Sequence, residues 1–283
     1  MIFADAHLHS NPVSGLGIEK IAKRFKSLGG WFMALVSLPP THYGLQQDRD
    51  GYVKAIDITI AECRKARSLG LRVACFAGIH PADLEKLLTR HMADPRKVLE
   101  LSEYVLREIA RRCQEGLLDG IGEIGRPHYT TRPEAFVINE LIMNKALTLA
   151  KDLNVVVHLH LEQGGIVTVM DINQRVETLR LMKGKIILHH LDYKTAREAV
   201  RYGLPFTIPA KYPLLKHAFT HLEPVYMIES DYIDDPKRPG VAAYPWDVIE
   251  IQLTLLKEGV VNEEYLYKLN VDNIVTVYGV EPP

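Results

Sequence analysis

The chain has 283 residues, of which 47% are hydrophobic and 24% are charged, so it is long enough to bury one large core. Its formal net charge is −1 and it has no long charged block, which excludes bulk attraction to nucleic acid. Three cysteines, Cys63, Cys75 and Cys113, are too few and too scattered to predict a disulfide framework or a zinc knuckle. No apolar run has the length of a membrane span, and the N-terminus lacks a signal-peptide pattern. We therefore predict a cytoplasmic protein in a reducing compartment, with no membrane partner.

Apolar runs of strand length alternate along the chain with segments of helical periodicity. The predicted strands cover residues 2–9, 31–36, 72–79, 118–124, 155–158, 186–188, 204–208 and 225–228. The predicted helices cover residues 18–28, 53–69, 94–115, 133–152, 166–182 and 194–202, and a last one starts at Asn262. The stretch after the third strand is predicted to be irregular. This alternation is typical of parallel α/β folds, either a (β/α)8 barrel or a doubly wound open sheet.

Residues of metal-binding type stand at the carboxyl ends of these runs. His7 and His9 share one face of the first strand, because side chains of a strand alternate between faces. Alone, this pair is also compatible with two hydrated or hydrogen-bonded histidines that bind no ligand. The later runs end at or next to His80, Glu123, His158, the pair His189-His190, and Asp231. A barrel gathers the carboxyl ends of its strands into one active site, and no GxGxxG motif or P-loop supports the open sheet. We predict a single (β/α)8 TIM-barrel domain over residues 1–283.

Six motifs, taken together, resemble the TatD-type metal-dependent hydrolases, and most closely the archaeal TatD-related branch of the amidohydrolase-like barrels. They are Asp5-Ala6-His7-Leu8-His9, Gly78-Ile79-His80-Pro81, Gly122-Glu123-Ile124-Gly125, Val156-Val157-His158, His189-His190 and Glu229-Ser230-Asp231. The resemblance covers nearly the whole chain, from residue 5 to about residue 247. It implies a TIM barrel, one to three divalent metal ions, and hydrolysis, often of phosphodiester bonds in DNA.

The chain departs from the TatD pattern in three places. Arg126-Pro127-His128-Tyr129 follows the Gly-Glu-Ile-Gly motif, where TatD nucleases usually have Leu-Asp and a tyrosine pair. His160 stands where these enzymes usually have an arginine, and His189-His190-Leu191-Asp192 replaces His-Cys-Phe-Ser-Gly. The metal-binding residues therefore match the family better than the substrate pocket does. The resemblance supports a hydrolase, whereas nuclease specificity is less well supported.

The resemblance implies a role for each strand-end residue. His7 and His9 would bind the more buried ion, and Asp231 would complete its ligand set. Glu123 would bridge to a second ion, because a carboxylate offers one oxygen to each of two cations. His158 and one histidine of the strand-six pair would hold that second ion. We expect two divalent ions, with zinc, magnesium and manganese as the candidate metals.

The strand-six pair leaves two alternatives, because neighbouring residues of a strand point to opposite faces. Direct alignment with the TatD motif favours His189 as the metal ligand. Archaeal relatives, in which an Asp-His pair occupies this place, favour His190, which we prefer. The other histidine would pack or support the ligands.

The expected reaction uses the metal ions to lower the pKa of a water molecule towards neutrality. Asp231 and Glu123 are the predicted catalytic residues, and Asp231 would take the proton of the water and return it to the leaving group. Glu229, deeper on the same strand face as Asp231, would orient a ligating histidine. His42, His91, His217 and His221 are expected to be surface or packing residues.

The substrate is expected to be anionic or strongly polar. The residues predicted to contact it at the mouth are His80, Arg126, His128 and His160. A small-molecule or nucleic-acid phosphoester is the favoured substrate, and a small amide or lactone is the alternative within the hydrolases. A pocket closed by residues 39–50 or 233–244 would favour a small molecule, whereas a groove rich in Lys and Arg would favour a nuclease. A metal-binding barrel without catalytic activity is the alternative from another class.

Overall fold

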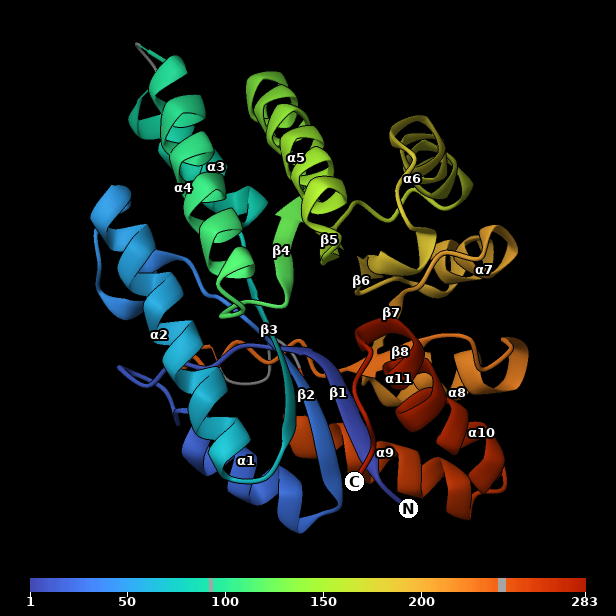
Figure 1. Ribbon diagram of the computed structural model, residues 1–283. Coiled ribbons are helices and arrows are strands. Elements are labelled where there is room, and N and C mark those ends of the chain that lie inside the picture. Colours follow the sequence, from blue (N-terminus) through green and yellow to red (C-terminus); the bar gives the residue numbers. More distant parts are fainter. Residues whose placement is uncertain (92–93, 239–242) are drawn as a thin grey trace.

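The computed structural model describes residues 1–91, 94–238 and 243–283 (Figure 1). Six parallel strands pair in chain order: β1 (Phe3–Leu8), β2 (Gly30–Val36), β3 (Arg72–Ala77), β4 (Gly120–Gly125), β5 (Val156–His160) and β6 (Ile186–His189). A second parallel pair consists of β7 (Thr207–Pro209) and β8 (Met227–Glu229). Single parallel bridges join this pair to both edges of the sheet, from Leu188 to Phe206 and from Leu8 to Tyr232. The strands thus close a ring, and the predicted barrel class is confirmed.

Helices follow the strands and surround them (Figure 1). In the first half of the chain they are α1 (Ile18–Ser27), the 3-10 turn η1 (Pro40–Tyr43), α2 (Arg49–Ser68), α3 (Pro81–Arg90), α4 (Arg96–Gln114) and α5 (Pro133–Leu153). In the second half they are α6 (Ile166–Leu179), the turn η2 (Lys183–Lys185), α7 (Tyr193–Tyr202), α8 (Tyr212–His221), α9 (Pro245–Lys257), α10 (Glu263–Tyr267), the π-helical turn η3 (Lys268–Asp272) and α11 (Asn273–Tyr278).

Local capping explains where the helices differ from the prediction. The stretch predicted to be irregular after the third strand is α3, because Pro81 opens it and the His80 ring accepts a hydrogen bond from the backbone N–H of Ala82 at 3.0 Å. Helix α2 begins earlier than predicted, because the Asp48 carboxylate accepts a bond from the Gly51 N–H. The sequence did not predict α8 and α9.

The register of the strands decides which side chains share a level in the barrel. His160 of β5 pairs with Gly125 of β4 on one side and with His189 of β6 on the other. His158 pairs with Ile187, two residues before the strand ends. His160 and His189 therefore lie at the same level near the carboxyl rim, and His158 lies one layer deeper.

The C-terminal elements η3 and α11 pack against the strands of the barrel. Asn270 accepts a hydrogen bond from the Trp31 indole on its backbone oxygen, at 2.9 Å. The Tyr278 ring of α11 lies 4.8 Å from the ring of Phe32 and 6.0 Å from that of Phe76. The last helix thus brings a phenol into the barrel interior, and the two termini of the chain end near each other (Figure 1).

Two of the three cysteines are joined. Cys63 of α2 and Cys75 of β3 form a disulfide with a Cα–Cα distance of 6.0 Å, and both side chains are buried. Cys113 is free and half-buried. The prediction of a reducing interior did not anticipate this bond, because spacing in sequence does not show that a helix and the following strand bring two thiols together.

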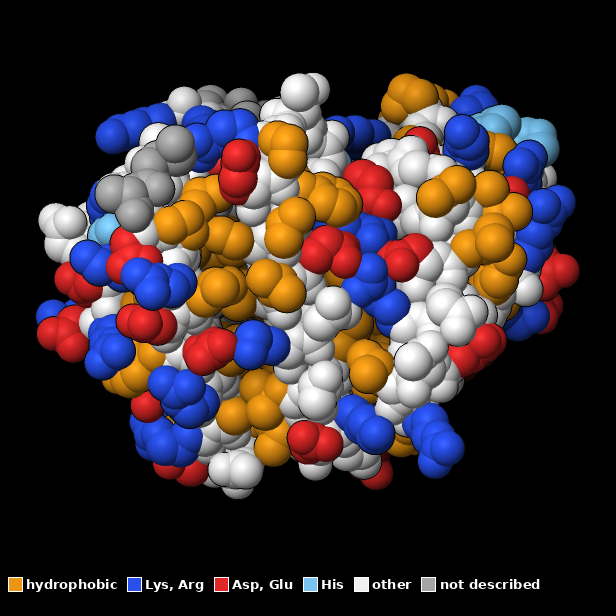
Figure 2. All heavy atoms as spheres, turned by 90° about the horizontal axis from the view of Figure 1, so that it is seen from above, with side chains coloured by type: hydrophobic (Ala, Val, Ile, Leu, Met, Phe, Trp, Pro, Cys, Tyr) orange, Lys and Arg blue, Asp and Glu red, His pale blue; other side chains and the backbone are white. Residues whose placement is uncertain are grey.

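The surface carries exposed apolar side chains over α5 and α6 (Figure 2). They are Phe136, Val137, Leu141, Ile166, Val167 and Met170. Within the described ranges, none of the helices combines the length and the apolar character that a membrane crossing requires.

Candidate metal centre

A cavity of about 620 Å³ opens at the carboxyl ends of the strands. Its wall includes residues at or just beyond the ends of all eight strands. The histidines and carboxylates that line it are His9, His42, His80, Asp83, Glu123, His128, His160, His189, His190, Asp192 and Asp231. Lys86, Lys211 and Arg238 also line it, from three different segments. The cavity therefore combines metal-binding groups with three cationic side chains at its rim.

Glu123 of β4 lies at the centre of this group, with imidazole nitrogens around its carboxylate. Its Oε2 is 2.9 Å from His160 Nδ1 and 3.2 Å from His189 Nε2. Its Oε1 is 3.7 Å from the Nε2 atoms of both His9 and His80. Burial alone would raise the pKa of Glu123, but His80 and His160 outweigh it and hold the pKa well below its usual range. The carboxylate is therefore charged and available to a cation.

The hydrogen-bond network assigns the tautomer of His7. Tyr278 donates its hydroxyl proton to the carbonyl oxygen of Ala6 at 3.1 Å, so it accepts from His158 Nε2, also at 3.1 Å. His158 Nδ1 is then an acceptor, and it receives the Nδ1 proton of His7 across 3.0 Å. The remaining nitrogen, His7 Nε2, carries a lone pair, is buried and has no hydrogen-bond partner. An orphaned buried nitrogen of this kind suits a metal ion.

His9 and His189 are oriented in the same way by their Nδ1 atoms. His9 Nδ1 lies 2.9 Å from the carbonyl oxygen of Val36, and His189 Nδ1 lies 2.8 Å from Glu229 Oε2. In both residues Nε2 is left facing the cavity. The ring of His189 stacks on that of His7 at 3.7 Å. Glu229 therefore occupies the orienting position predicted for it.

The surrounding carboxylates favour a positive charge at His189. Burial alone would lower the pKa of His189, but Glu229 and Glu123 raise it well above its ordinary value. The His189 Nε2 atom also lies 3.9 Å from Asp231 Oδ1. This part of the cavity is therefore built to hold a cation.

Asp231 follows β8 and has a left-handed backbone with φ of 53°. Its N–H donates to the carbonyl oxygen of His7 at 2.9 Å, which fixes the residue beside the first strand. Burial raises the pKa of Asp231 to about 8; His189 opposes this effect and Glu229 adds to it. The carboxyl group is partly open to the cavity.

These residues fit a divalent cation. Ligand atoms of His7, His9 and Asp231 lie within 4.8 Å of one another, as do those of His7, Glu123 and His189. The donors combine imidazole nitrogen with carboxylate oxygen, the set that Zn²⁺ and similar ions accept. The two groups share His7 and adjoin each other, so they form one continuous centre.

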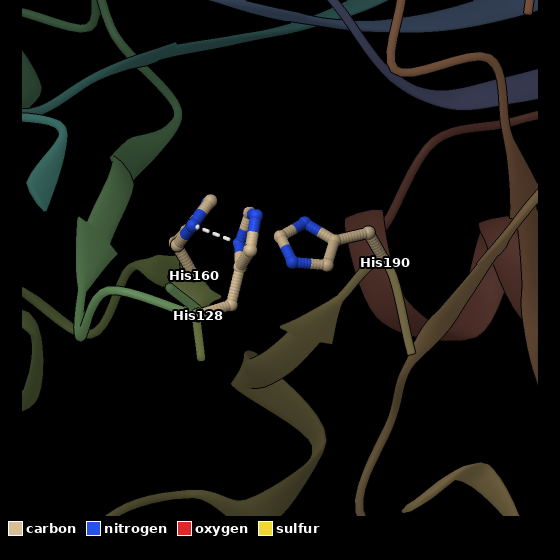
Figure 3. Close-up of side chains that lie close together, drawn as sticks. All are labelled: His128, His160 and His190. Carbon is tan, nitrogen blue, oxygen red and sulfur yellow. Dashed lines mark hydrogen bonds between the residues drawn. The ribbon is translucent and has the colours of Figure 1, made fainter. Parts of the chain in front are cut away.

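A second group lies further out. His128, His160 and His190 point toward one another at the mouth (Figure 3). His189 and His190 both line the cavity, although strand alternation predicts that only one can enter it. The reason is that β6 ends at His189, and His190 has φ of 49°, which turns its side chain back over the mouth. The geometry favours His189 for the inner centre, where we preferred His190.

The structure places two other predicted site residues away from the inner centre. His158 is buried below His7 with both ring nitrogens engaged, and it belongs to none of the metal-type groups formed by the described residues. Arg126 points out of the barrel, where Glu162 binds it through two hydrogen bonds and Asp171 through one. Arg126 does not line the cavity.

His80 lines the cavity, and so do three residues that the sequence analysis did not assign to the site: His42, Lys86 and Lys211. His80 Nδ1 accepts the cap bond of α3, so its other nitrogen carries a proton toward the cavity. His42, predicted to be a surface or packing residue, is part of the wall. Lys86 of α3 and Lys211, which lies two residues after β7, also line the cavity.

An α/β barrel with a histidine–carboxylate cluster at the carboxyl ends of its strands is the general plan of metal-dependent barrel enzymes. Within this class the chain belongs to the family described as TatD related DNase, which matches residues 4–279.

Individual proteins are similar to this chain over nearly its whole length. An uncharacterized protein of Methanocaldococcus jannaschii is 28% identical over 279 residues, which cover 98% of this chain and 95% of that protein. The crystal structure of a TatD-like protein from Archaeoglobus fulgidus matches with a TM-score of 0.68 and 18% identity, over 97% of this chain and 99% of that chain. A TatD homologue from Escherichia coli matches with a TM-score of 0.67 and 17% identity, over 99% and 98%. The two crystal structures have the same fold.

Proposed function

We propose that this protein is a divalent-metal-dependent hydrolase of phosphoesters. The observation that carries the proposal is the position of Asp231 and Glu123 among inward-facing histidines, in a cavity whose rim has three cationic side chains. Cations at the rim match the negative charge of a phosphoester and have no counterpart in a neutral amide or lactone. Family membership supports the same reaction class.

The size of the cavity bears on the substrate. Its walls include Pro39 and His42 on one side and Ile233 and Arg238 on another. These residues belong to the two segments, 39–50 and 233–244, that were predicted to close a pocket; residues 239–242 lie outside the described part of the chain. A volume of about 620 Å³ suits a small phosphoester or the end of a nucleic-acid strand.

His7, His9 and Asp231 would hold one ion, and Glu123 with His189 would hold its neighbour. When bound, divalent ions supply Lewis-acid activation of a water molecule and stabilise negative charge in the transition state. Asp231, whose carboxyl group is partly open to the cavity, would accept the proton of the attacking water and then donate it to the leaving oxygen. The His80 N–H faces the cavity and can donate to a phosphoryl oxygen.

The test is a hydrolysis panel with phosphodiesters, phosphomonoesters, single-stranded DNA, lactones and amides, measured with zinc, manganese or magnesium. We expect phosphoester turnover that falls by about 10²- to 10⁴-fold in Asp231→Asn, while the fold and the content of bound metal are kept. Activity confined to lactones or amides would refute the phosphoester assignment. Unchanged phosphoester hydrolysis in Asp231→Asn would remove Asp231 from the mechanism.

A further inference from the structure

We propose that His128, His160 and His190 form an additional transition-metal site at the mouth of the barrel, next to the inner centre; His160 also groups with His80 and Glu123, and His190 with His189 and Asp231. All three lie where the chain departs from the TatD pattern. The site therefore rests on residues that set this chain apart from the TatD pattern. It concerns metal binding alone and does not depend on the proposed hydrolysis.

The three imidazoles converge. Ligand nitrogens of His128, His160 and His190 all lie within 4.8 Å of one another. His128 Nδ1 is 2.8 Å from His160 Nε2, and the ring of His190 lies edge-on to both, 5.1 Å and 4.5 Å away (Figure 3). Three nitrogens this close can reach one ion at a bond length of about 2.0–2.1 Å after small side-chain rotations.

The structure holds His190 firmly in this position. Its N–H donates to Thr207 Oγ1 at 3.0 Å, and its carbonyl oxygen accepts from Gln163 Nε2, also at 3.0 Å. The left-handed backbone between these two bonds directs the ring over the mouth. The Nε2 atom of His190 is nevertheless buried and has no hydrogen-bond partner. A buried nitrogen without a partner is costly unless a ligand satisfies it.

His160 presents the correct nitrogen to this site. Its Nδ1 atom contacts the Glu123 carboxylate, so the proton of the neutral ring stays on Nδ1 and the lone pair on Nε2 faces His128 and His190. A carboxylate behind a ligating imidazole increases its basicity and fixes its orientation. Glu123 would thus act on both centres, as a ligand of the inner one and as support for the outer one.

The ligand set determines the metal. Three neutral imidazoles suit Zn²⁺, Co²⁺ or Ni²⁺ and bind Mg²⁺ or Ca²⁺ poorly, because those ions prefer oxygen. Three protein ligands leave a fourth position open, as in catalytic zinc sites. All three side chains line the cavity, so a water molecule or an anionic oxygen of a bound molecule could fill that position.

The experiment measures zinc content by mass spectrometry after equilibrium dialysis, for the wild type and for the double variant His128→Gln/His190→Gln. We expect the double variant to bind one zinc fewer per chain, and its content of magnesium or manganese to equal that of the wild type. His42→Gln is the matched control, because His42 lines the same cavity but belongs to no candidate metal group. It should keep the wild-type zinc content.

A second comparison separates this site from the inner one. The variant His9→Gln/Asp231→Asn should lose the inner zinc and retain the outer ion. When Co²⁺ replaces zinc in this variant, its visible absorption spectrum should show coordination by nitrogen. Equal zinc content in the wild type and the His128→Gln/His190→Gln variant would overturn the outer site and leave the inner centre standing. Absence of zinc from the wild type would overturn both. If the double variant unfolds, the single variant His128→Gln replaces it, because His128 is exposed. Its affinity for the outer zinc ion should be at least tenfold lower than that of the wild type.

Discussion

The Nδ1 atoms of His7 and His158 lie 3.0 Å apart, so the proton position of one buried imidazole decides that of the other. His158 is held in turn by the hydroxyl of Tyr278, which contributes from the last helix of the chain. This series of hydrogen bonds ends at His7 Nε2, the nitrogen left for a metal ion. The C-terminal helix therefore helps to prepare a ligand that belongs to the first strand.

Tyr278→Phe should weaken metal binding without unfolding the protein. The substitution leaves His158 Nε2 without its acceptor, so the tautomer of His7 is no longer fixed. Loss of such a supporting residue typically costs 10- to 100-fold in metal affinity. Competition with a chromogenic chelator measures the zinc dissociation constant. Tyr265→Phe is the matched control, because Tyr265 bonds to Tyr226 and Leu222 away from the centre. Equal zinc affinity in Tyr278→Phe and wild type would contradict this role.

Glu229→Gln should have a comparable effect through His189. The carboxylate lies 2.8 Å from His189 Nδ1, and it raises the pKa of that imidazole. The amide retains a similar shape but removes the charge, so the ring becomes less basic and binds a cation less tightly. We expect zinc affinity to fall about tenfold or more, measured by the same competition. Glu258→Gln, at the exposed end of α9, should leave affinity unchanged.

Much of the barrel and of its inner centre could be predicted from the sequence. The reason is that carboxyl ends of parallel strands converge, so residues far apart in the chain, such as His9, Glu123 and Asp231, must meet. The spacing of residues along the sequence does not show how deep each one lies in the barrel. This depth distinguishes His158, which pairs with Ile187, from His160, which pairs with His189 at the rim.

Two other features depend on information that a single sequence does not contain. The positive φ of His190 turns its side chain toward the mouth of the barrel, whereas the alternation of side chains along a strand predicts that it points away from the interior. The partners of Arg126 come from α5, α6 and the loop after β5, so its ion pairs could not be read from its neighbours in the chain.

Removal of metal should lower the stability of the protein reversibly. Ions that bind only the folded state stabilise it by about 4 kcal/mol when their concentration is a thousandfold above Kd. Treatment with a chelator should therefore lower Tm, and zinc should restore it. The variant His9→Gln/Asp231→Asn should show a much smaller rise in Tm with zinc. An identical rise in wild type and variant would place the stabilising ion outside the inner centre.

Arg126→Met should destabilise the fold and leave the metal content intact. Arg126 is buried and bonds to Glu140, Glu162 and Asp171, so its removal leaves several carboxylates facing each other. Loss of one partner of a buried ion pair costs about 3–5 kcal/mol. Urea denaturation at neutral pH measures this change. Lys145→Met breaks an exposed pair with Glu103 and should cost less than about 1 kcal/mol.

The same variant should show a characteristic dependence on pH. Burial alone would raise the pKa of Asp171, but hydrogen bonds from Arg175 and Arg126 outweigh it, and the pKa is lowered. A carboxyl group with a lowered pKa stabilises the folded state above its unfolded pKa of about 3.9, and this contribution is lost as pH falls through the folded pKa. The difference in unfolding free energy between wild type and Arg126→Met should therefore be largest near pH 7 and shrink below about pH 4. A difference that stays constant from pH 7 to pH 3 would show that Arg126 stabilises the fold by packing and not by its charge.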